Sequence, residues 1–93
     1  MEQKDFILVV NVYRTEAGNE PVRAWLRELS RDDKRIIGED IKTAQLGWPL
    51  GMLLIRKMDK KLWEVRSHLP DGIARVFFTV DGNQMILLHG FIK

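Results

Sequence analysis

The sequence predicts an α+β fold in which a small antiparallel sheet carries a two-helix hairpin on one face. Two observations predict this class. Apolar residues recur with the 3.6-residue period of a helix between residues 20 and 46, and they alternate with polar residues, as in strands, between residues 62 and 92. Another alternating segment precedes the helices, so the predicted order is β-α-α-β-β-β. The chain of 93 residues is expected to form a single domain, residues 1–93, with one modest core.

The first strand and the first helix are predicted from local composition. Residues 6–13 alternate and are rich in β-branched and aromatic side chains, which favours a strand. Asn19 is expected to cap a helix that takes Pro21 in its first turn and ends near Leu29. The apolar side chains that repeat along one side of this helix are Val22, Leu26 and Leu29.

The second helix is predicted to start at Ser30, where Ser30 and Asp33 resemble a capping box with Asp in place of Glu. It is expected to run to Leu46, because the Gly-Trp-Pro sequence at 47–49 ends a helix. Its apolar repeat consists of Ile37, Ile41 and Ala44. The two helices are therefore expected to pack together as a hairpin.

The segment between the helices and the sheet is ambiguous. Its apolar part, residues 49–55, favours a linker packed on the core over a short strand. The following run at 56–61 is the densest cationic segment and is interpreted either as a solvated loop or as part of a basic binding surface. The second interpretation is supported by the charge distribution, since residues 1–50 carry a net charge of −1 and residues 51–93 carry +3.

Three strands are predicted near residues 62–67, 73–80 and 84–92, separated by turn-forming residues at 69–72 and 81–83. Placing Arg66 opposite Arg75 brings four apolar residues of the first hairpin onto one face, because Val65 then pairs with Val76 and Trp63 with Phe78. The two opposed arginines on the other face are expected to repel each other unless an anion or Glu64 compensates. If residues 81–83 form a three-residue loop, His89 is expected opposite Arg75 and Leu87 opposite Phe77.

Composition excludes several classes of protein. The chain has no Cys, so disulfides and thiolate chemistry are excluded. It also lacks a Gly-rich phosphate loop, helically spaced His ligands and a Ser/His/Asp triad, so no metal and no cofactor is expected. The apolar run at 6–10 is too short for a signal-peptide core or a membrane span, and a cytoplasmic protein without a membrane partner is expected.

Four ordered segments resemble the HigB-like, phage-derived branch of the RelE/ParE toxin superfamily, which belongs to type II toxin-antitoxin systems. The resemblance covers nearly the whole chain. The segments are Asn19-Glu20-Pro21-Val22, at the start of the helical hairpin; Leu62-Trp63-Glu64-Val65-Arg66, which is similar to the family's L-W-E-[LV]-R strand; Arg75-Val76-Phe77-Phe78; and Leu88-His89-Gly90-Phe91.

This resemblance implies a RelE-like fold and a metal-independent endoribonuclease, an mRNA interferase that cleaves mRNA at the ribosome and inhibits translation. It also implies a cognate antitoxin, usually of the helix-turn-helix type. By position, Arg66, Arg75 and His89 match polar residues of the family's active-site region. Lys93 matches the first lysine of a C-terminal K-K-x-x-K-T-P-like segment, and since the sequence ends there, part of that basic segment is expected to be missing.

The candidate residues suit RNA cleavage on chemical grounds as well. Arg66 and Arg75 present forked, permanently charged donors that fit phosphate and an anionic transition state, and Glu64 is expected to orient Arg66. His89 is the candidate for proton transfer, with a hydrogen-bonded core histidine as the alternative. The candidates for RNA binding are Lys57, Lys60, Lys61 and Lys93 for phosphates, and Phe77 and Phe91 for stacking on a base, with core packing as the alternative for the two Phe residues.

Two other functions remain open from the sequence. A toxin of the same fold could act by binding and poison DNA gyrase, as the ParE side of the superfamily does. A truncated, non-enzymic domain could retain only antitoxin recognition.

Overall fold

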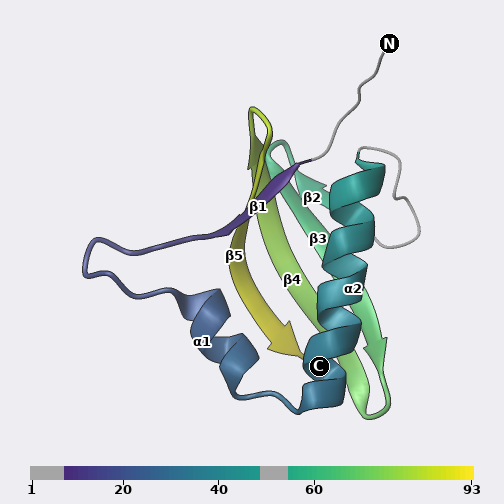
Figure 1. Cartoon of the computed structure of the whole chain (residues 1–93). Helices are drawn as coiled ribbons and strands as arrows, with labels where there is room; N and C mark the ends of the chain where they lie inside the picture. The colour runs from purple at the N-terminus through teal and green to yellow at the C-terminus, as the bar shows by residue number, and fades with distance from the viewer. Residues whose placement is uncertain (1–7, 49–54) are drawn as a thin grey trace.

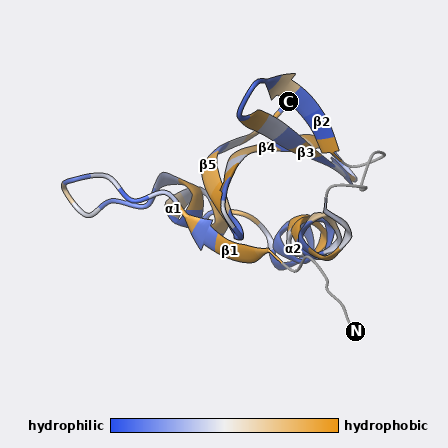
Figure 2. Ribbon diagram, turned by 90° about the horizontal axis from the view of Figure 1, so that it is seen from above, coloured by the Kyte–Doolittle hydropathy of each residue, from blue (hydrophilic) through white to orange (hydrophobic). Residues whose placement is uncertain are grey.

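The computed structural model describes residues 8–48 and 55–93, and it confirms the α+β class (Figure 1). The elements are β1 (Val9–Val12), α1 (Pro21–Arg27), α2 (Arg31–Gly47), β2 (Ile55–Asp59), β3 (Leu62–Leu69), β4 (Gly72–Asp81) and β5 (Gln84–Ile92). The strands form one sheet in the order β1-β5-β4-β3-β2. Seen from above, the sheet curves and α2 lies within the curve (Figure 2).

The predicted four-stranded antiparallel sheet is wrong in two respects. Strands β2 to β5 form an antiparallel meander, but β1 joins its β5 edge in the parallel direction, from Val9 opposite Gln84 to Val12 opposite Leu87. The sheet also has a fifth strand, β2. The direction of β1 depends on how α1 and α2 cross the sheet, which the pattern of β1 alone does not encode.

Strand β2 occupies part of the cationic run, for which a solvated loop is one interpretation from the sequence. Ile55 is buried opposite Val65, while Arg56 and Lys57 are exposed on the outermost strand. Cationic side chains on an edge strand discourage pairing with other chains, which explains why this strand carries so few apolar residues. Of the predicted linker at 49–55, residues 49–54 lie outside the described residues.

The helix starts follow the prediction closely for α2 and less closely for α1. The Ser30 Oγ accepts a hydrogen bond from the Asp33 backbone N–H at 3.1 Å, which confirms the predicted cap of α2. The cap residue of α1 is Glu20 rather than Asn19, without a side-chain capping bond, and the helix ends at Arg27 rather than Leu29.

The helices lie on the same face of the sheet but on different strands. Helix α2 packs on β3, whereas α1 packs on β5 and β1, so the predicted hairpin is open and each helix buries its apolar side mainly against the sheet (Figure 1). The core between them and the sheet contains Leu8, Val22, Ile37, Ile41, Ala44, Ile55, Val65, Ala74, Val76, Phe78, Met85 and Leu87. No helix in the described part of the chain is long and apolar enough to cross a membrane.

The register of the β3–β4 hairpin is the predicted one. Arg66 lies opposite Arg75, and the apolar pairs Val65–Val76 and Trp63–Phe78 face the helices. The turn between the strands has two residues, Pro70 and Asp71.

The predicted register of β4 and β5 is wrong. The loop has two residues, Gly82 and Asn83, rather than three, and Gly82 adopts a positive φ of 61° as a tight hairpin turn requires. This loop shifts the pairing by one residue, and a β-bulge at Leu88 shifts it by another in the same direction. Two shifts preserve the face of each side chain, so His89 remains turned away from the helices, but its partner is Phe77 and the partner of Arg75 is Phe91.

Candidate functional site

The sheet face opposite the helices carries the candidate residues in neighbouring rows, and we call it the helix-free face. Because side chains alternate along a strand, the residues that pair across β3, β4 and β5 on this face form a grid. It consists of Glu64, Arg66 and His68 from β3, Ile73, Arg75 and Phe77 from β4, and His89 and Phe91 from β5. The intervening residues of β3 and β4 face the core.

A single buried carboxylate connects the two arginines of this face. The Arg66 Nε–H donates to the Glu64 Oε1 at 2.7 Å, and the Arg75 Nη1 lies 3.7 Å from the Glu64 Oε2. The Glu64 side chain is fully buried, whereas Arg66 and Arg75 are 33% and 26% exposed. The cations therefore reach the surface while the anion that holds them does not.

The Glu64 contacts involve the Arg66 Nε and the Arg75 Nη1 and do not include the other Nη groups of the two arginines. The Arg75 Nε and the Glu64 Oε2 are buried atoms without a hydrogen-bond partner among the described residues, so they are not accessible to a ligand. Two guanidinium groups against one carboxylate leave a local net charge of +1. A face with an excess positive charge and unused forked donors is suited to an oxyanion such as a phosphodiester.

Three rings lie beside the arginines. The Phe77 and His89 rings are stacked, with centroids 6.3 Å apart and 27° between their planes, and Phe91 lies 5.9 Å from Phe77 and 5.8 Å from His89. His89 is exposed and the two Phe residues are half-buried. His89 is therefore not a buried core histidine, the alternative interpretation from the sequence, and the rings form a surface on which a flat group can rest.

The structure brings some of the predicted site residues together and separates others. Arg66, Arg75, His89, Phe77 and Phe91 share the helix-free face. Lys93 lies at its end, where its backbone exchanges hydrogen bonds of 2.9 and 3.1 Å with Ile73.

The lysines of the cationic run lie farther away. Lys57 pairs with Trp63 and its Nζ lies 6.0 Å from the centroid of that ring, so it belongs to the opposite face. Lys60 and Lys61 form the turn between β2 and β3. Lys61 directly precedes Leu62, the first residue of β3, and Arg66 lies four residues farther along this strand. At the rise of a strand, the turn is therefore roughly 13 Å from Arg66 along the backbone.

Sequence reasoning misses one contributor to this face, Arg56. It allows for Glu64 to offset the repulsion between Arg66 and Arg75, and Glu64 does face both arginines. Arg56 lies opposite Glu64 across the β2–β3 pair and is exposed, so it extends the cationic row. The alternation around Ile55 could place Arg56 on this face if residues 55–59 are interpreted as a strand.

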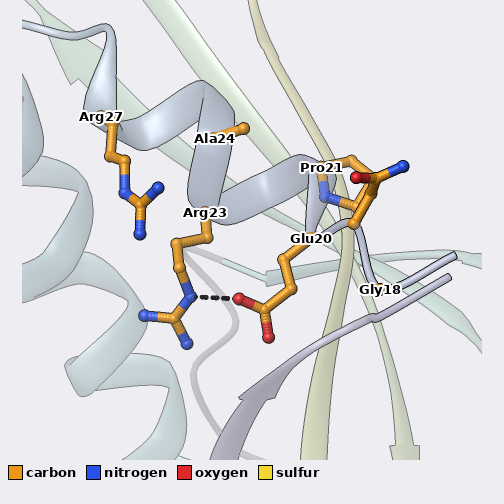
Figure 3. A pocket seen from close by; sticks show the side chains of 7 residues that line it. Gly18, Glu20, Pro21, Arg23, Ala24 and Arg27 are labelled. Carbon is orange, nitrogen blue, oxygen red and sulfur yellow. Dashed lines mark hydrogen bonds and ion pairs between the residues drawn. The ribbon is translucent and has the colours of Figure 1, made fainter.

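Two hollows in the described part of the surface lie beside α1 and away from the helix-free face. One has a volume of about 360 Å³ and includes Arg23, whose Nε donates to the Glu20 Oε1 at 2.6 Å (Figure 3). Another, of about 340 Å³, lies between β1, α1 and α2 and has mostly apolar walls. Neither of these two hollows includes a residue of the helix-free face.

The described residues contain no group of three or more His, Asp or Glu side chains that could hold a metal ion. The proton-transfer and charged groups of the helix-free face include the imidazoles of His68 and His89, the guanidinium groups of Arg56, Arg66 and Arg75, and the carboxylate of Glu64. This set can bind an oxyanion and includes side chains that can transfer protons.

Comparison with known proteins assigns the chain to a family. No curated protein and no solved structure matched the chain. A family model described as phage-derived protein Gp49-like (DUF891) matches residues 24–93, which include α2, the whole β2–β5 meander and every residue of the helix-free face. The chain therefore belongs to the phage-derived Gp49-like family, a family associated with RelE-like toxins of toxin-antitoxin systems.

Proposed function

We propose that this chain is the toxin of a type II toxin-antitoxin system, similar to HigB, and that it is an endoribonuclease cleaving mRNA on the ribosome. The observation that carries the proposal is the pair of arginines held by one buried carboxylate beside a surface of three rings. The family's association with RelE-like toxins supports the toxin class. Cleavage of mRNA in the cytoplasm would inhibit translation.

The proposed chemistry is attack of an RNA 2′-hydroxyl on the adjacent phosphodiester, with departure of the 5′-oxygen. This reaction requires removal of one proton, stabilisation of the charge on the phosphorane and delivery of one proton to the leaving oxygen. Arg66 and Arg75 stabilise the charge, since guanidinium groups keep their protons. His89 is exposed at the same face, and its imidazole takes the proton of the 2′-hydroxyl and delivers a proton to the departing 5′-oxygen.

The proposed contacts to the rest of the RNA follow the same face. Phe77 and Phe91 lie beside His89, where an unpaired base can stack. Lys93, at the end of the face, and Lys60 and Lys61, in the β2–β3 turn, bind backbone phosphates. The sequence predicts the same role for Lys57. Because Lys57 lies beside Trp63 on the other face of the sheet, we propose that it contacts a phosphate farther from the arginine pair.

The proposal is tested by cleavage of mRNA on purified ribosomes. Arg75→Ala should lower the cleavage rate by roughly 10²- to 10³-fold, and Arg75→Lys should recover only part of it because Lys lacks the bidentate fork. His89→Gln should lower the rate, because the Gln amide cannot transfer a proton. The folded yield of His89→Gln should match that of the unaltered chain, since His89 is exposed. Rates of the Arg75 variants are compared per folded molecule, because Arg75→Ala removes a counter-charge of the buried Glu64 and should also lower stability.

A further variant separates the two roles available to His89. His89→Phe preserves a ring beside Phe77 and Phe91 but cannot transfer a proton. The proposal requires His89→Phe to be as slow as His89→Gln. If Arg75→Ala and His89→Gln both remain fully toxic in cells, cleavage at this face is wrong, and a binding mechanism such as gyrase poisoning takes its place.

A further inference from the structure

Glu64 is the one charged side chain that is fully buried in the described part of the chain. Removing a carboxylate from water costs several kcal/mol, and a pair of this kind is often less stabilising than apolar residues of the same size. Glu64 lies opposite Phe77, on a face where its neighbours are half-buried or exposed. Stability alone therefore does not account for an acidic residue at this position.

The contacts of Glu64 indicate another role. Its two carboxylate oxygens are directed to different strands, with Oε1 bonded to Arg66 of β3 and Oε2 nearest to Arg75 of β4. Opposed arginines on paired strands repel each other, and without an anion between them their side chains would turn apart. Since Glu64 uses the Nε–H of Arg66, it fixes that guanidinium plane and leaves the outer Nη donors for a ligand.

We infer that Glu64 is the positioning residue of the arginine pair: it orients both guanidinium groups toward a single phosphodiester and contributes to the cleavage rate rather than to RNA affinity. This inference rests on the proposed function. Catalysis by fixed charges depends on their orientation before the reaction starts, and small misplacements cost large factors in rate. Affinity depends mainly on total positive charge, which Glu64 reduces.

Glu64→Gln separates these two effects. The amide oxygen can still accept from the Arg66 Nε–H, but the NH₂ group replaces the oxygen that faces Arg75, so donor meets donor and Arg75 is released. The local charge rises from +1 to +2. We expect the cleavage rate at saturating toxin to fall by roughly 10- to 100-fold. Binding of an oligonucleotide that is 2′-O-methylated throughout, and so cannot be cleaved, should be unchanged or several-fold tighter.

Glu20→Gln is the matched control. Glu20 also forms an ion pair with an arginine, at 2.6 Å from the Arg23 Nε, but on α1, which covers the opposite face of the sheet. It adds the same change in net charge without touching the arginine pair, so the cleavage rate should be that of the unaltered chain. Glu64→Asp retains the charge but is one methylene shorter, and its rate should fall between those of Glu and Gln.

A Glu64→Gln chain that cleaves bound RNA at the original rate overturns the inference, and so does one that loses RNA affinity and rate together while folded. If Glu64→Gln does not fold, the unaltered chain still decides: the Arg66 Nε–H should exchange with solvent at least tenfold more slowly than that of the exposed Arg27 in ¹⁵N NMR spectra, and equal exchange overturns the inference.

These results also separate the inference from the proposed function. If the unaltered chain cleaves no RNA on ribosomes, the proposed endoribonuclease activity fails by itself. The orientation of the arginines by Glu64 is then judged by the NMR exchange of Arg66 and by the affinity of the 2′-O-methylated oligonucleotide, where a Glu64→Gln chain that binds more weakly counts against it.

Discussion

Gly90 has a role that depends on its missing side chain rather than on an unusual backbone conformation. A Cβ built on Gly90 would lie 2.4 Å from the Trp25 Cζ3 and 2.6 Å from the Cε3. The indole of α1 therefore lies directly on the backbone of β5. This contact connects α1 to the strand that also carries His89 and Phe91, so packing on one side of β5 supports the candidate site on the other.

Gly90→Ala should destabilise the protein by about 1–3 kcal/mol, because the added methyl displaces a large ring from a packed position. Gly38→Ala is the comparison within the same chain. Gly38 lies in the interior of α2 with no atom within 4 Å of a built Cβ, so Ala should stabilise the helix by about 0.5–1 kcal/mol. Urea unfolding measures both, and equal effects in the two variants would show that Trp25 does not depend on Gly90.

Strand β2 changes the interpretation of the cationic run. As an edge strand it distributes its side chains over both faces of the sheet, with Arg56 on the helix-free face and Lys57 on the other. Its two-residue turn places Lys60 and Lys61 at one end of the hairpin, where Lys60 is held by a 2.7 Å hydrogen bond from its N–H to the Asp59 Oδ1. A ligand on the helix-free face can therefore reach Arg56 more easily than Lys57.

Changing Lys60 and Lys61 together to Gln should weaken binding of single-stranded RNA and flatten its salt dependence by roughly one unit of log-log slope for each phosphate that the variant no longer binds. Lys57→Gln serves as the control from the opposite face and should change the slope less. Binding titrations at several salt concentrations provide the measurement. An unchanged slope in the folded double variant would show that the turn is solvated surface only.

The whole molecule presents two different surfaces to partners. The helix-free face is cationic and carries aromatic rings, whereas the helix side is apolar in the hollow between β1, α1 and α2, which includes Val10, Leu26, Ile41 and Leu87. Family membership implies an antitoxin partner. An apolar hollow accepts an apolar anchor residue of such a partner at small desolvation cost.

Hydrogen exchange of the complex with the cognate antitoxin, compared with the free chain, should show new protection along α1, α2 and β1. The reason is that an antitoxin anchored in the hollow covers the backbone on that side and leaves the arginine pair for a separate, charge-driven contact. Protection confined to β3, β4 and β5 would place the antitoxin over the helix-free face and reject the helix-side site.

Local patterns account for much of the fold because they are short-range in origin. The Ser30 cap, the start of α1 at Pro21 and the β3–β4 register follow from capping chemistry, the fixed φ of proline and the requirement that apolar pairs share one face. The last of these requirements is sufficient to predict Arg66 opposite Arg75. The roles of those arginines and of His89 in cleavage remain predictions.

The sequence by itself determined the α+β class, the approximate bounds of most elements and the faces of β3 and β4, because the hydrophobic period fixes which side of each element is buried. Only the tertiary structure decided three other features: the strand at 55–59, the parallel entry of β1, and the two-residue loop that together with the bulge at Leu88 puts His89 beside Phe77 instead of Arg75. A sheet edge, a strand direction and an extra residue in a ladder depend on partners distant in sequence. The sharing of Glu64 between two arginines has the same cause, since β3 and β4 must pair before one carboxylate can face both.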